Sequence, residues 1–147
     1  MGTRVDFYVG RGERAEWLGS YPYDGYPYGV FQQNEELPSD EQGWRAWVAN
    51  FLERSDEKAT LPEHGWPWPW ETSATTDFAY AFDAGKVYGS NFGRDWFEVD
   101  PTVEDFGEPE EDSPKTAVFP DMSSRKAVTY GPRSGLIVMG FAAGGTS

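Results

Sequence analysis

The sequence of 147 residues contains no cysteine, so disulfide bonds and thiolate metal sites are both excluded. It also lacks any apolar run near the roughly 18 residues that a membrane-spanning helix requires. The first residues, Met1 to Asp6, lack the charged-then-apolar order of a secretory signal, and Asp6 stands where a myristoylation signal has Ser or Thr. We therefore expect a cytoplasmic protein without a membrane partner.

Positive charge is also scarce, because 12 Lys and Arg face 25 Asp and Glu, which gives a net charge of −13. Residues 1–94 carry −7, residues 95–112 carry −9 with no basic residue, and residues 113–147 carry +3. A field of this sign repels phosphate backbones. Direct nucleic-acid binding is therefore disfavoured, and a protein with a basic surface is the expected partner.

No catalytic motif stands out. Gly10 to Ala15 spell G-x-G-x-x-A, but only Glu16 to Ser20 follow before a Tyr-Pro loop, so the crossover helix of a dinucleotide site has no room. His64 is the single histidine, which favours a loop residue over a general base assisted by Glu63 or Glu71. We favour a protein that is not an enzyme and expect no cofactor or metal.

Aromatic residues are abundant, at 17%, while hydrophobic residues make up 38%, so the core must rely on a few large rings. Thr3 to Val9 alternates, with Val5, Phe7 and Val9 on one face, and predicts a strand. Thr76 to Ser90 predicts a β-hairpin with a three-residue loop, Asp83-Ala84-Gly85, in which Gly85 takes the positive φ. Further strand candidates are Glu13 to Ser20 (a short helical turn being the alternative), 92–99, Thr116 to Phe119, Lys126 to Tyr130 and Gly135 to Phe141.

One helix is predicted to begin at Ser39 as N-cap, with Gln42 as its capping-box partner, and to end near Ser55. Its apolar stripe comprises Trp44, Trp47, Val48, Phe51 and Leu52. Together the elements indicate an α+β fold, a mostly antiparallel β-sheet of five to seven short strands with one amphipathic helix packed on one face. We expect a single domain over residues 1–141 and a mobile tail over residues 142–147.

Two aromatic segments allow opposite interpretations. Trp66-Pro67-Trp68-Pro69-Trp70 is predicted to be extended, and either plugs the sheet with its rings, which we favour, or offers a platform for a sugar, a base or a proline-rich peptide. At least one of its rings should remain on the surface. Tyr21 to Tyr28 is predicted to be an irregular loop, which either caps a sheet end or binds a partner.

The acidic run from Asp95 to Asp112 contains nine carboxylates. It lacks the calcium-loop spacing D-x-[DN]-x-[DN]-G, and Pro109 interrupts it. Three interpretations remain: a solvated acidic loop, as such runs usually are, the acidic composition of a protein from a salt-adapted host, or a mimic of nucleic-acid phosphates that docks on a basic protein.

Four segments, Thr3 to Gly12 (TRVDFYVGRG), Glu16 to Ser20, Asp24 to Pro27 and Gly65 to Trp70 (GWPWPW), together resemble a group of small phage and prophage proteins with no established activity. The resemblance spans about the first two-thirds of the chain and carries no catalytic residues. It implies an origin in a mobile element and an accessory factor that acts on host machinery in the host cytoplasm.

The leading hypothesis is therefore a non-enzymatic, phage-type inhibitor of a host defence complex, for example an anti-CRISPR-like protein, that docks through an acidic face. The residues predicted to steer this docking are Glu104, Asp105, Glu108, Glu110, Glu111 and Asp112, and the predicted anchors are Tyr26, Tyr28 and Trp68. The alternative is a small-ligand module with a Trp- and Tyr-lined pocket for a nucleotide-derived signal or a sugar, with phosphate held by Arg11, Arg14 and Arg94. An enzyme that uses His64 or an Arg/Glu pair, and a virion component, are the remaining alternatives.

Overall fold

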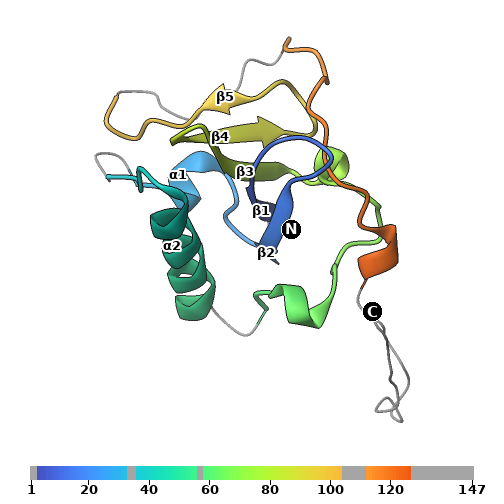
Figure 1. Ribbon diagram of the computed structural model, residues 1–147. Helices are drawn as coiled ribbons and strands as arrows, with labels where there is room; N and C mark the ends of the chain where they lie inside the picture. Colours follow the sequence, from blue (N-terminus) through green and yellow to red (C-terminus); the bar gives the residue numbers. More distant parts are fainter. Residues whose placement is uncertain (1–2, 33–35, 56–57, 104–111, 127–147) are drawn as a thin grey trace.

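The computed structural model describes residues 3–32, 36–55, 58–103 and 112–126 (Figure 1). These residues form a five-stranded, mostly antiparallel sheet and one main helix, α2 (Glu41–Arg54), which confirms the expected α+β class. The strands are β1 (Val5–Val9), β2 (Glu16–Tyr21), β3 (Phe78–Asp83), β4 (Lys86–Asn91) and β5 (Phe97–Glu98). The short elements are α1 (Pro27–Val30) and the 3-10 helices η1 (Pro62–His64), η2 (Ser73–Thr75) and η3 (Ser123–Arg125).

The sheet is built from two hairpins joined side by side in the order β2-β1-β3-β4-β5. The first hairpin, β1–β2, resolves the alternative for Glu13 to Ser20 in favour of a strand, and Gly10 and Gly12 turn the chain with φ of 86° and 107°. β1 and β3 are parallel, with Asp6 beside Ala79. Parallel neighbours need a crossover connection. The chain from β2 to β3, which contains α2 and residues 58–77, makes that connection.

The second hairpin, β3–β4, confirms the central sequence prediction except for the length of its loop. Asp83 pairs with Lys86, so only Ala84 and Gly85 form the turn, with φ of 53° and 81°. Two consecutive positive φ values define a type I′ turn, whose twist matches that of the flanking strands. The predicted three-residue loop is therefore wrong by one residue.

One face of the sheet packs against α2 and forms the larger core. Val5 and Phe7 project from β1 to this face, as their alternation predicts, and both are fully buried. The ring of Phe7 lies 5.4 Å from that of Phe51 and 6.2 Å from that of Trp44. Each buried ring removes on the order of 150–250 Å² from water, so a few aromatic side chains account for most of this core.

The ends of α2 agree with the prediction at the carboxyl end and differ by one residue at the amino end. The N-cap is Asp40 rather than Ser39, and its Oδ1 accepts a hydrogen bond from the backbone N–H of Gly43 at 2.7 Å. Ser and Asp are similarly good N-cap residues, so residue type alone could not decide between Ser39 and Asp40. Ser55 ends the helix, with its N–H bonded to the carbonyl of Phe51.

The opposite face of the sheet is covered by two segments without strand structure, residues 66–76 and 112–126, which Figure 1 shows away from α2. Their contacts bury a second cluster that comprises Tyr8, Trp17, Trp66, Ala79, Ala81, Phe119 and Met122. Backbone bonds from Met122 N to Glu71 O and from Trp66 N to Arg125 O, both 2.7 Å, join the two segments. The predicted strand Thr116 to Phe119 is therefore wrong, because this segment lies over the sheet instead of extending it.

Other predictions meet the structure only in part. Of the predicted Tyr21 to Tyr28 loop, Tyr21 still belongs to β2 and residues 22–26 are irregular, but Pro27 then begins α1, where proline's missing N–H costs nothing. β5 confirms the expected edge strand within 92–99. Of the expected strand 126–130 only Lys126 is described, and it forms an isolated parallel bridge with Trp66. The expected strand 135–141 and the expected tail 142–147 lie outside the described residues.

Candidate functional site

A buried carboxylate, Asp6 of β1, lies under the second face of the sheet and is 0% exposed. The hydroxyl groups of Ser20 and Ser73 donate to it at 2.5 Å each, and the indole N–H of Trp68 donates at 2.7 Å. The Thr76 hydroxyl also favours the ionised form, since it lowers the pKa of Asp6. No salt bridge among the described residues reaches Asp6, so its charge is solvated by neutral donors alone.

A second layer of donors holds the first. The outer bonds, at 2.7–3.0 Å, run from Trp17 to Ser20, from Trp70 to Thr76 and between Tyr8 and Ser73. Ser73 has one hydroxyl proton, which it gives to Asp6, so Tyr8 must be the donor in the last of these bonds. Every hydrogen bond in the network therefore points towards Asp6. The network connects β1, β2 and η2 with the tryptophan segment, residues 66–70.

The environment shifts the ionisation of both acidic groups in this network. Burial raises the pKa of Asp6 above its ordinary value, and the hydrogen bonds from Ser20, Ser73, Trp68 and Thr76 oppose that rise. Burial, together with the nearby charge of Asp6, raises the pKa of Tyr8 well above its ordinary value. Tyr8 therefore stays protonated and remains a donor. Asp6 was not among the predicted site residues, since its only signal is a carboxylate inside an alternating strand.

The tryptophan segment, residues 66–70, lies against the sheet as the structural interpretation predicts. Trp66 is 1% exposed and packs edge-on against Trp17, with ring centroids 5.2 Å apart. Trp68 and Trp70 are half-buried and stacked at 5.7 Å. The guanidinium of Arg4 lies 5.1 Å from the ring centroid of Trp70 and 5.9 Å from that of Trp68, so the chain's own cation covers both rings.

The predicted partner-binding residues fall in three places. Tyr26 and Tyr28, at the start of α1, are 44% and 48% exposed. Val30 of the same helix is buried in the core that also contains residues of α2, so α1 lies on the α2 side of the sheet. Trp68 lies on the opposite face, with its indole N–H bonded to Asp6. Asp112 is described and exposed. The other five predicted acids, Glu104, Asp105, Glu108, Glu110 and Glu111, lie outside the described residues.

Five basic side chains of the described residues pair with the chain's own carboxylates. Six ion pairs join Arg4 to Asp77, Arg11 to Asp83, Arg45 to Glu16 and Glu41, Lys86 to Glu98 and Lys126 to Glu71. Exposed acids without an ion pair in this part of the chain are Glu13, Asp24, Glu36, Asp40, Glu53, Glu63, Asp95, Asp112 and Asp121. The surplus negative charge is therefore displayed to solvent.

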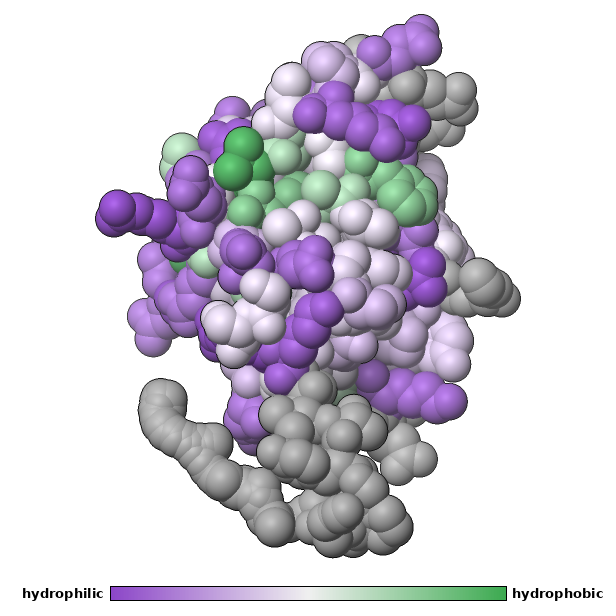
Figure 2. All heavy atoms as spheres, turned by 90° about the vertical axis from the view of Figure 1, so that its right-hand side faces the viewer, coloured by the Kyte–Doolittle hydropathy of each residue, from purple (hydrophilic) through white to green (hydrophobic). Residues whose placement is uncertain are grey.

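An apolar area accompanies this charge on the side of the molecule that carries residues 112–126, where Figure 2 shows hydrophobic atoms bordered by hydrophilic ones. Phe92 and Val118 are 37% and 51% exposed. Their sequence neighbours Gly93 and Ala117 are joined by a backbone hydrogen bond from Ala117 N to Gly93 O at 3.1 Å. In the sequence, the predicted acidic run ends at Asp112, six residues before Val118. The sequence did not single out Phe92 or Val118.

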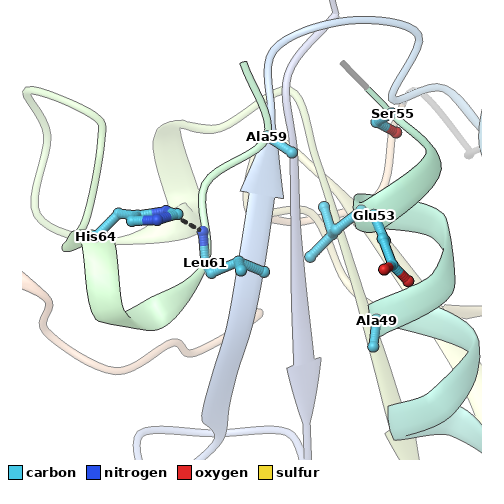
Figure 3. A pocket seen from close by; sticks show the side chains of 7 residues that line it. Ala49, Glu53, Ser55, Ala59, Leu61 and His64 are labelled. Atoms are coloured by element: carbon cyan, nitrogen blue, oxygen red, sulfur yellow. Dashed lines mark hydrogen bonds between the residues drawn. The ribbon is translucent and has the colours of Figure 1, made fainter. Parts of the chain in front are cut away.

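A hollow with a volume of about 480 Å³ lies between α2 and residues 59–64 (Figure 3). Its lining comprises Ala49, Leu52, Glu53, Ser55, Ala59, Leu61 and His64, without a Trp, Tyr or Arg. The Nδ1 of His64 accepts a hydrogen bond from the Leu61 N–H at 3.0 Å, which places the proton of the neutral ring on Nε2. His64 is exposed, but it ends the 3-10 helix η1 and is not the loop residue that the sequence predicted.

The arginines that the small-ligand alternative requires do not meet. Arg11 donates to Asp83 at 3.0 Å and lies 3.8 Å from the ring centroid of Tyr88, near the turn of the β3–β4 hairpin. Arg94 donates to Asn91 at 2.7 Å, where β4 ends. Tyr88 and Asn91 are three residues apart on β4, about 10 Å at the usual rise per residue, and each guanidinium is engaged by a different group.

Within the described residues, no group of three or more His, Cys, Asp or Glu is placed to hold a metal ion. No helix in the same part of the chain is long and apolar enough to cross a membrane. Comparison of the chain with protein-family models, with curated proteins and with solved structures gives no match.

Proposed function

We propose that the protein is a non-enzymatic binding protein that docks through its acidic surface onto a basic, nucleic-acid-binding host protein, as a phage-type anti-defence factor such as an anti-CRISPR-like protein would. The observation that supports this proposal most directly is the combination of a net charge of −13 with basic side chains that pair inside the chain. The carboxylates that form no ion pair are exposed to solvent, and a protein with a basic surface would complement their charge.

Charge of this kind acts mainly on the rate of encounter. Complementary fields raise the association rate, and the effect weakens as salt shortens the Debye length to about 8 Å at physiological ionic strength. The six acids from Glu104 to Asp112 are the densest source of negative charge in the sequence. We assign the steering role to them.

Residence of the complex requires apolar contact. Tyr26 and Tyr28 offer partly exposed rings at the start of α1, and Phe92 and Val118 offer exposed apolar side chains elsewhere on the surface. Large side chains that lose their remaining exposure in a complex contribute most of the binding energy of an interface. Trp68 is a weaker candidate for an anchor residue than its residue type predicts, because its indole N–H already donates a hydrogen bond to Asp6.

The test is a pull-down from host lysate at low and at physiological salt, followed by binding kinetics with the partner that elutes. Glu108→Lys, Glu110→Lys and Glu111→Lys, introduced together, should reduce the association rate severalfold at low salt and much less at high salt. The matched control is Glu13→Lys, Glu53→Lys and Glu63→Lys, which changes the net charge equally at other positions. Equal association rates for the two triple variants would rule out docking through the acidic run.

A second candidate function is binding of a small ligand in the hollow beside α2. Its volume falls within the range of small-molecule sites, roughly 300–1,000 Å³. The leucine and alanine lining suits an apolar ligand better than the nucleotide or sugar that the sequence suggested. A thermal-shift screen of apolar carboxylates, nucleotides and sugars separates these ligands, since a bound ligand raises the melting temperature. Leu61→Trp, which fills the hollow, should abolish any such shift.

A further inference from the structure

Asp6 poses an energetic question that docking to a partner does not answer. A buried ion without a counter-ion is costly, and the hydrogen bonds around it offset only part of that cost. Asn would accept a hydrogen bond at the same place without the charge. The residues that solvate the carboxylate come largely from one covering segment, residues 66–76, which includes Trp68, Ser73 and Thr76.

We propose that Asp6 is a proton-operated catch for residues 66–76: the segment lies more firmly on the sheet when Asp6 is protonated and opens more readily when Asp6 is ionised. The geometry supplies the coupling, since Trp68 and Ser73 of this segment donate directly to the carboxylate and lifting the segment would admit water to it. The proton comes from solvent and joins one carboxylate oxygen, so no other reactant is required.

The direction follows from linkage. With the segment open, Asp6 is hydrated and titrates near the ordinary value for aspartate, about 3.9. With the segment closed, burial raises its pKa. The closed state therefore binds a proton more tightly than the open state. The ratio of closed to open molecules is highest below the open-state pKa, falls about tenfold per pH unit between the two pKa values, and is constant above the closed-state pKa.

The remaining groups around Asp6 do not titrate in this range. Tyr8 of β1 stays protonated, β2 contributes Ser20 backed by Trp17, and β3 contributes Ala79 in register. The covering segment contributes only indole and hydroxyl groups. Charged groups near these side chains are Arg4, which lies over Trp68 and Trp70 and pairs with Asp77, and Arg125, 5.9 Å from the ring centroid of Trp17.

One contact of the segment would respond to pH with the opposite sign. Glu71 lies 3.7 Å from Lys126, and both groups belong to the covering segments. Loss of the Glu71 charge would weaken this pair, whereas protonation of Asp6 strengthens closure. The pair is exposed and therefore worth little, and Glu71→Gln removes it from the experiment.

The test is hydrogen exchange of the indole N–H groups, followed by NMR between pH 4 and pH 8 and expressed as protection relative to free tryptophan at each pH. Protection of the Trp66 and Trp68 indoles should fall by about tenfold per pH unit over the window in which Asp6 titrates. The Trp44 indole, which donates to Tyr8 O under α2, is the internal control and should keep constant protection. Glu71→Gln should retain the pH dependence, and Asp6→Asn should remove it.

Three results would overturn the proposal: pH-independent protection in the wild type, a parallel change at Trp44, or unchanged pH dependence in Asp6→Asn. If Asp6→Asn does not fold, the 13C chemical shift of the Asp6 carboxyl group in the wild type takes its place. Its midpoint must lie above the ordinary range and must coincide with the change in protection. A carboxyl group that titrates near 3.9, or at a pH unrelated to the exchange, contradicts the catch.

Discussion

Replacing Ser73 by alanine is the most direct perturbation of the network around Asp6. Ser73 Oγ lies 2.5 Å from Asp6 Oδ2 and 2.7 Å from Tyr8 Oη, so its removal breaks two buried bonds. A hydrogen bond to a charged group contributes about 1.5–3 kcal/mol, and a buried hydroxyl left without a partner costs about 1–3 kcal/mol. We expect Ser73→Ala to reduce the free energy of unfolding by about 3 kcal/mol or more.

The double-mutant cycle with Tyr8→Phe separates the two contributions. In the Ser73→Ala background, Tyr8→Phe removes the orphaned hydroxyl, so the double variant should be more stable than the sum of the two single losses predicts. The coupling should reach about 1–2 kcal/mol. Urea unfolding followed by tryptophan fluorescence measures it, provided that the slope with denaturant stays constant.

Ser123→Ala is the matched control, because Ser123 also donates to a carboxylate, Asp121 at 2.7 Å, but at the surface. It should cost well below the buried substitution, about 0.5 kcal/mol, since water replaces the lost bond. A Ser73→Ala loss no larger than this control, or strictly additive losses in the cycle, would refute the inward-directed network.

Two further predictions concern the boundaries that the sequence misplaced. Asp40→Ala should lower the free energy of unfolding by about 1 kcal/mol, because it removes the cap of α2, whereas Ser39→Ala should change it by less than about 0.3 kcal/mol. Chemical denaturation of both variants measures the two free energies. A larger loss for Ser39→Ala than for Asp40→Ala would identify Ser39 as the N-cap. Ala84→Asn should raise the free energy of unfolding by about 0.5–1 kcal/mol, because asparagine tolerates the positive φ of a type I′ turn better than alanine does; a lower melting temperature for this variant would argue for a longer loop.

Local patterns predicted the elements whose partners are close in sequence. The alternation of Val5, Phe7 and Val9 identified β1 and its core face, and the stripe from Trp44 to Leu52 identified α2. The β3–β4 hairpin was also recognisable, because a turn and its two strands are contained in 15 residues. In each case the residues that determine the structure are neighbours in the sequence.

Features that depend on distant residues were not predictable. Alternation placed Asp6 and Tyr8 on the second face of β1 but could not show that residues 66–76, some 60 positions later, cover that face. Thr116 to Phe119 has the composition of a strand, yet backbone bonds to Gly93 and the burial of Phe119 hold it across the sheet instead. Local propensity is the same for a segment that extends a sheet and for one that covers it.

The parallel pairing of β1 with β3 also determines the order in which the protein can assemble. The two hairpins close over short loops, whereas their union must bring together residues more than 70 positions apart, as Val5 and Phe78 are. Closing so long a loop is entropically expensive and slow, so the union is expected to come late in folding. Asp6 therefore stays hydrated until the last assembly step, and acidic refolding conditions should hasten that step.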